Sequence, residues 1–100
     1  MTKQVVITKT VNPATKFTQA REFYGVKVDG KDPNIGVMPN APVVDVIEAV
    51  LRKLKYVAIL NGAEPFDVAI TTPVAISDVV KTFIKDKYET EPQFNSVVFS

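Results

Sequence analysis

The chain has no cysteine and no histidine among its 100 residues. Without cysteine, neither a disulfide framework nor a thiolate metal site can form. Without histidine, the protein lacks the commonest general base, the commonest zinc ligand and every Ser-His or Cys-His catalytic pair. We therefore expect a protein that has no cofactor and is not an enzyme of the familiar nucleophilic kinds.

Glycine is scarce, and neither positive nor negative charge predominates. Gly25, Gly30, Gly36 and Gly62 are isolated from one another, so the sequence has no glycine-rich loop of the kind that cradles phosphate. The formal net charge is +1. This balance argues against an acidic mimic of DNA and against a strongly basic nucleic-acid coat protein.

Long apolar runs are absent as well. No run approaches the roughly 18 residues that a transmembrane helix needs. Residues 1–4 lead into a strand-like segment without a signal-peptide pattern. We expect a cytoplasmic or otherwise intracellular protein with no membrane partner.

The composition that remains is typical of a globular domain. Hydrophobic residues make up 46% and charged residues 23% of the sequence. A chain of this length buries roughly two-thirds of its unfolded surface, which is enough for one core. We expect residues 1–100 to form a single compact domain.

Residues 42–62 carry the pattern of a long amphipathic helix. At about 100° per residue, the apolar side chains fall within an arc of roughly 160°, and an arc this wide predicts packing against a sheet. Pro42 suits the first helical turn, and Asn61-Gly62 suits a left-handed cap that ends the helix. The expected apolar face consists of Val43, Val44, Val46, Ile47, Val50, Leu51, Leu54, Val57 and Ala58.

Three strands are predicted before this helix. Residues 5–11 and 16–28 have strand-like patterns, and residues 35–38 form a short return strand. Asp29-Gly30 is the strongest hairpin signal, although Asp32-Pro33 after it predicts a loop longer than two residues. These segments predict a three-stranded antiparallel meander.

Three further elements are predicted after the helix. Residues 66–71 form a compact apolar strand, expected to be buried on both faces of a mixed sheet. Thr72-Pro73 resembles the start of a second amphipathic helix that ends near Tyr88-Glu89. Residues 94–99 form a last strand, which pairs either within the domain's own sheet or with a partner's sheet. The second helix's expected apolar face consists of Ile76, Val79, Val80, Phe83, Ile84 and Tyr88.

The order of these elements resembles that of the ribonuclease H-like fold. The run IEAVLRKLKYVAILNGAEPFDVAITTPVAISDVVKTFIKDK is similar to that family's central helix, strand and second helix. The similarity covers residues 43–88 in pattern and residues 4–40 only in topology. It implies the α/β class, as an α+β arrangement with a mixed sheet.

The resemblance also implies where catalytic residues would lie. In that family, carboxylates hold two magnesium ions about 4 Å apart for phosphodiester cleavage. Here residues 8–10 (TKT) and Thr72 stand where the family has aspartates, and the last acidic position lies beyond the final strand. Asp45 or Glu48 on the long helix would be the one surviving ligand. A single carboxylate cannot hold two divalent ions, so the resemblance implies an inactive nuclease.

Two candidate surfaces remain on the predicted helices. Asp45 and Glu48 are weak candidates for a cation site, the alternative being a solvated face on which Glu48 pairs with Arg52. Basic residues of both helices would contact phosphate if the protein bound nucleic acid, although acidic residues interleave with them. These basic residues are Arg52, Lys53, Lys55, Lys81 and Lys85.

From these observations we expect a non-catalytic, ribonuclease H-like interaction or assembly module. Its partner would be another protein or a second copy of the chain. Two alternatives stay open. One is a nucleic-acid-binding module that uses the basic residues of the two helices, and the other is a metal-dependent nuclease with an incomplete site at Asp45 and Glu48.

Overall fold

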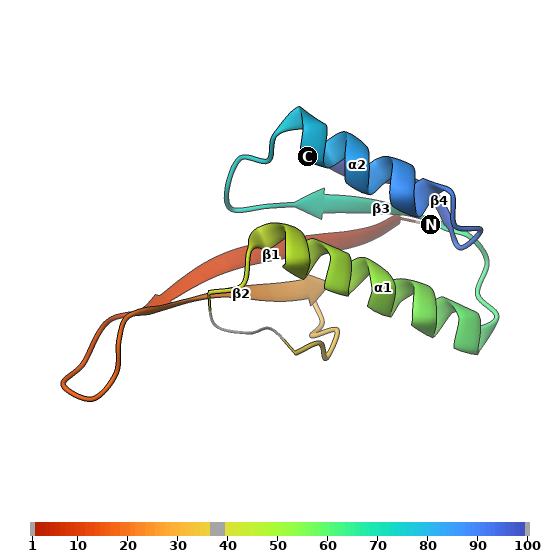
Figure 1. Cartoon of the computed structure of the whole chain (residues 1–100). Helices are drawn as coiled ribbons and strands as arrows, with labels where there is room; N and C mark the ends of the chain where they lie inside the picture. The colour runs from red at the N-terminus through yellow and green to blue at the C-terminus, as the bar shows by residue number, and fades with distance from the viewer. Residues whose placement is uncertain (1, 37–39, 100) are drawn as a thin grey trace.

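A computed structural model describes residues 2–36 and 40–99. It shows a four-stranded sheet in the order β2-β1-β3-β4, in which β1 and β2 are antiparallel while β3 and β4 run parallel to β1. Both helices lie on the same side of this sheet (Figure 1). The mixed sheet with two helices confirms the predicted α/β class. The elements are β1 (Thr2–Asn12), β2 (Arg21–Val28), α1 (Val43–Asn61), β3 (Phe66–Thr71), α2 (Asp78–Glu89) and β4 (Phe94–Phe99).

The turn after β2 is shorter than predicted. Asp29 and Gly30 both have positive φ, 51° and 80°, as a two-residue hairpin turn requires. Val28 and Lys31 on either side exchange two backbone hydrogen bonds, of 2.8 and 3.0 Å. The Asp-Gly signal therefore prevails over the following Asp32-Pro33, which lies outside the turn.

The return strand predicted at residues 35–38 is not seen in the described part of the chain. Ile35 and Gly36 are not in a strand, and residues 37–38 lie outside the described residues. Asn34, just before them, has a φ of 59°, which interrupts extended backbone. The chain nevertheless returns to the outer edge of β2, where the Asn40 amide donates to Glu22 O at 2.8 Å and Asn40 Oδ1 accepts from the Glu22 amide at 3.1 Å.

Helix α1 packs on the sheet largely as its periodicity predicts. Gly62 follows it with a φ of 59°, and its amide donates to Ile59 O while that of Ala63 donates to Ala58 O, which is the Schellman arrangement. Pro42 precedes the first turn as the N-cap residue. The predicted Val57 is the exception on the apolar face, since it is 38% exposed. The buried side chains are Val46, Ile47, Val50, Leu51, Leu54 and Ala58.

Helix α2 begins later than predicted. Ser77 is its N-cap, and the Ser77 Oγ accepts a hydrogen bond from the Val80 amide at 3.3 Å. Thr72 instead uses its hydroxyl to donate to Val74 O at 2.8 Å, which closes a local turn. Thr72-Pro73 therefore lies in the connection before the helix and does not start it.

The buried stripe of α2 is narrower than predicted. Ile84 and Tyr88 are buried, and Val80 is half-buried against them. Val79 and Phe83, both predicted on this face, are 80% and 58% exposed. A single stripe at i, i+4 spacing is enough because α2 packs chiefly against β4, which is an edge strand of the sheet.

Strand β3 is buried on one face only, in contrast to the prediction. Phe66, Val68 and Ile70 face the helices and are buried, whereas Asp67 and Ala69 on the other face are half-buried. Strand β4 pairs with β3 in parallel, so the structure shows the first of the two predicted pairings, the one within the domain's own sheet.

Candidate functional site

Of the two carboxylates proposed for a cation site, Asp45 and Glu48, the second already pairs with a cationic side chain. The Glu48 carboxylate binds Lys87 Nζ of α2 at 2.7 Å, not Arg52 of its own helix as predicted. Helical periodicity predicts only pairs within one helix, whereas the packing of the folded chain brings Lys87 of α2 close to Glu48 of α1. The hydrogen bond that Lys87 donates to Glu48 raises the pKa of Lys87. Within the residues that the structure describes, no three acidic groups are close enough together to hold a metal ion.

The five basic residues proposed for nucleic-acid contacts do not form one uniform cationic patch. Lys55 pairs with Glu91 at 2.9 Å, and Lys85 pairs with Glu89 at 3.1 Å. Among these five, and within the described ranges, no ion pair involves Arg52, Lys53 or Lys81. Carboxylates thus neutralise part of the surface that would contact phosphate.

The Lys85–Glu89 pair has a second role at the edge of the sheet. Lys85 Nζ donates to Val97 O at 2.7 Å, and the Val97 amide donates to Glu89 Oε2 at 2.8 Å. The hydrogen bond from the Val97 amide, assisted by Lys85, lowers the pKa of Glu89. Two side chains of α2 therefore occupy both backbone groups that β4 would offer to another strand at this position.

The sheet face opposite the helices is open, and sequence reasoning missed it. The strand register places Val6 beside Thr71, and Ala69 beside Val98, on this face. Val6 is 41% and Val98 is 49% exposed. Figure 1 shows both helices on the other side of the sheet. Parallel strands usually have both faces covered, so three parallel neighbours with one bare face are unusual.

Further large apolar side chains are exposed away from this face. On the outer side of α1, Tyr56, Ile59 and Leu60 are 58%, 55% and 65% exposed. Phe17, in the loop that joins β1 and β2, is 93% exposed. The spacing of Tyr56, Ile59 and Leu60 (i, i+3, i+4) was the available sequence signal for an apolar outer stripe.

Comparisons of the chain with protein-family models, curated proteins and solved structures found no match. The ribonuclease H-like resemblance therefore remains a prediction. Among the described residues, no helix has the length and apolar character needed to cross a membrane.

Proposed function

We propose that the chain is a non-catalytic interaction module of ribonuclease H-like topology, which binds another protein through the open face of its sheet. The observation that supports this function is the bare face itself. It exposes Val6 and Val98 on strands that belong to a parallel set. A covering partner would remove this apolar surface from water and complete the two-sided burial that parallel strands usually have.

The chemistry of the open face suits a protein partner. Most of its positions are apolar or uncharged, with Gln4 beside Ala69 and Val6 beside Thr71. The anionic Asp67 at one side accepts a hydrogen bond from Ser96 Oγ at 2.8 Å. Lys27, paired in register with Val6, contributes a cation near the other edge. Interfaces of this mixed character, with few charges at the centre, are typical of protein–protein contacts. A second copy of the chain is the first occupant to test.

The test replaces both valines of the open face by lysine, as Val6→Lys with Val98→Lys. We expect the wild-type chain to form a dimer in sedimentation velocity, and the double variant to associate at least about tenfold more weakly, because two apolar contacts are replaced by charges. Val79→Lys is the matched control, since Val79 is 80% exposed on α2 and lies off the face. Equal association of the double variant and the control would exclude this face as the dimer contact.

If the wild-type chain is monomeric, the same face is tested for a different protein. A photoreactive amino acid is placed at position 98 or, as control, at position 79, in cells that produce the chain. A discrete adduct formed from position 98 only, and lost with Val6→Lys, would support a specific partner. The same set of adducts from both positions would contradict the proposed face.

Nucleic acid is the alternative partner. Labelled single-stranded DNA, duplex DNA and an RNA–DNA hybrid would be titrated by fluorescence anisotropy at low and moderate salt, with and without magnesium. Binding that weakens steeply with salt, and that is reduced by Arg52→Gln or Lys81→Gln, would favour phosphate contacts. Magnesium-dependent cleavage abolished by Asp45→Asn with Glu48→Gln would instead support the nuclease alternative.

A further inference from the structure

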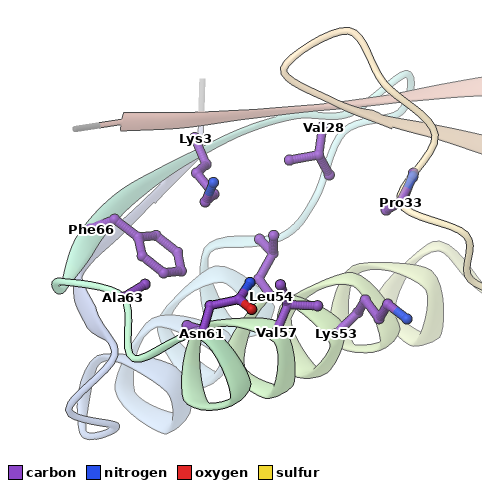
Figure 2. A pocket seen from close by; sticks show the side chains of 10 residues that line it. Lys3, Val28, Pro33, Lys53, Leu54, Val57, Asn61, Ala63 and Phe66 are labelled. Atoms are coloured by element: carbon purple, nitrogen blue, oxygen red, sulfur yellow. The ribbon is translucent and has the colours of Figure 1, made fainter.

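A cavity of about 240 Å³ lies between the C-terminal half of α1 and the sheet (Figure 2). Side chains from β1, β2, α1 and the start of β3 line it, together with Pro33 and Ala63 from the connections. Most of the lining is apolar: Val28, Pro33, Leu54, Val57, Ala58, Ala63 and Phe66. The polar lining residues are Lys3, Lys53 and Asn61.

Both charged side chains of the cavity are cations. Lys3 extends from β1 toward Phe66, and its Nζ lies 5.4 Å from the centroid of that ring (Figure 2). Lys53 lines the cavity from α1, and Figure 2 shows it farther from Phe66 than Lys3 is. Neither lysine has an ion pair within the described part of the chain, whereas Lys55 on the same helix is paired with Glu91.

We propose that this cavity binds a small amphipathic carboxylate, whose hydrocarbon body contacts the apolar wall and whose head group pairs with Lys3. The apolar wall favours removal of a hydrocarbon chain from water. The Lys3 ammonium, which belongs to a half-buried residue and lies over the Phe66 ring, would form a charge-assisted hydrogen bond with the carboxylate. The volume lies below the roughly 300–1,000 Å³ of pockets for drug-sized molecules, so the ligand is short.

Other ligand classes fit this lining less well. An organic cation would be repelled by both lysines. A neutral hydrocarbon would fill the apolar part but leave Lys3 without an anion. Inorganic phosphate would pair with Lys3 but leave the wall without a hydrocarbon partner. The last carbonyls of α1 carry partial negative charge near this end, yet the Gly62 and Ala63 amides already bind two of them.

The site is separate from the open sheet face, so the two proposals can fail independently. The probe is hexanoate, compared with 1-hexanol and hexylammonium of equal chain length, in ¹H–¹⁵N NMR titrations of the full chain. We expect saturable shifts at Lys3, Leu54 and Ala63 with hexanoate, weaker binding of 1-hexanol and no binding of hexylammonium. Absence of saturable shifts at these residues, or equally tight binding of hexylammonium, would overturn the proposal.

Two variants test the roles of the head group and the cavity. Lys3→Gln should weaken hexanoate binding about tenfold, as expected for loss of one charge-assisted hydrogen bond. Lys81→Gln makes the same charge change on α2, away from the cavity, and should leave the affinity unchanged. Ala63→Leu should fill the mouth of the cavity and abolish binding while the NMR spectrum stays dispersed. Equal affinities of Lys3→Gln and Lys81→Gln, or full binding by Ala63→Leu, would show that the carboxylate does not occupy this site.

Discussion

At the scale of single residues, the contact between α1 and the sheet is the place where one substitution has the clearest consequence. Leu51 has 0% exposure, so Leu51→Ala removes buried methyl groups and leaves a cavity, at a cost of about 2–5 kcal/mol in the free energy of unfolding. Leu60→Ala is the matched control, because Leu60 lies on the same helix and is 65% exposed. Its cost should stay within about 0.5 kcal/mol. Urea unfolding followed by circular dichroism measures both, and similar costs would mean that the buried face of α1 is wrongly assigned.

Predictions for single residues were correct where the burial of a side chain follows from the periodicity of its own helix. The period of 3.6 residues correctly placed Leu51 and Leu54 on the buried face of α1. It could not find the partner of Glu48, because Lys87 is far away in the sequence and is brought near only by the packing of α2. It also overestimated the burial of Phe83, since a period says which residues share a face but not how wide a face is covered.

At the scale of elements, α2 both covers the sheet and closes the edge of β4 through Glu89. Because the pKa of Glu89 is lowered in the folded protein, its stabilising contribution is present above the ordinary glutamate pKa and is lost as pH falls through the folded value. We therefore expect Glu89→Gln to reduce stability by about 1 kcal/mol at pH 7, a modest value for a partly exposed charged hydrogen bond. The difference from wild type should shrink as pH falls below the ordinary glutamate pKa.

Urea unfolding of both proteins between pH 7 and pH 3 provides the measurement. Glu64→Gln is the control, since Glu64 is exposed in the connection between α1 and β3 and should show little difference at any pH. If the difference in the free energy of unfolding between wild type and Glu89→Gln is the same at pH 7 and pH 3, the assigned role of the carboxylate is contradicted.

The sequence predicted the existence of most elements but not all of their limits. The bounds of β3 and β4 agree with the structure, because a proline, Pro65 or Pro92, lies shortly before each of these short runs. The start of α2 was wrong, because Thr72-Pro73 and Ser77-Asp78 both carry the signature of a helix N-terminus. The hydroxyl of Thr72 decides between them by bonding to Val74 O, and this bond is a property of the folded loop.

At the scale of the whole molecule, the open sheet face could not be predicted from the sequence. In the run FDVAIT of β3, Asp67 is the sequence signal for an exposed second face, but it does not decide the matter because Ala69 and Thr71 tolerate either environment. The outcome depends on both helices lying on the same side, which is decided by the order of the strands and the connections between them. The cavity proposed to bind a carboxylate is likewise formed by segments from four parts of the chain, so no local sequence pattern predicts it.

The molecule consists of a body in which the helices cover the sheet and a hairpin end that projects from it (Figure 1). Residues 9–22 are all exposed, and Figure 1 shows the loop between β1 and β2 extending away from both helices. Hydrogen bonds that involve the loop are local, as between Thr15 and Thr18. This hairpin end should therefore contribute little to the stability of the body.

Replacing residues 13–20 by Asn-Gly tests this division, because Asn12 and Arg21 are directly opposite in the register and can be joined by a two-residue turn. Closing a shorter loop costs less entropy, so the free energy of unfolding should be unchanged or rise by about 1 kcal/mol. The urea m-value should stay nearly constant, since exposed loop residues bury little surface on folding. A loss of more than about 2 kcal/mol would show that the loop, including the exposed Phe17, stabilises the body. If stability is retained, Phe17 is free to act in binding, and the shortened chain separates any role of the loop from that of the open sheet face.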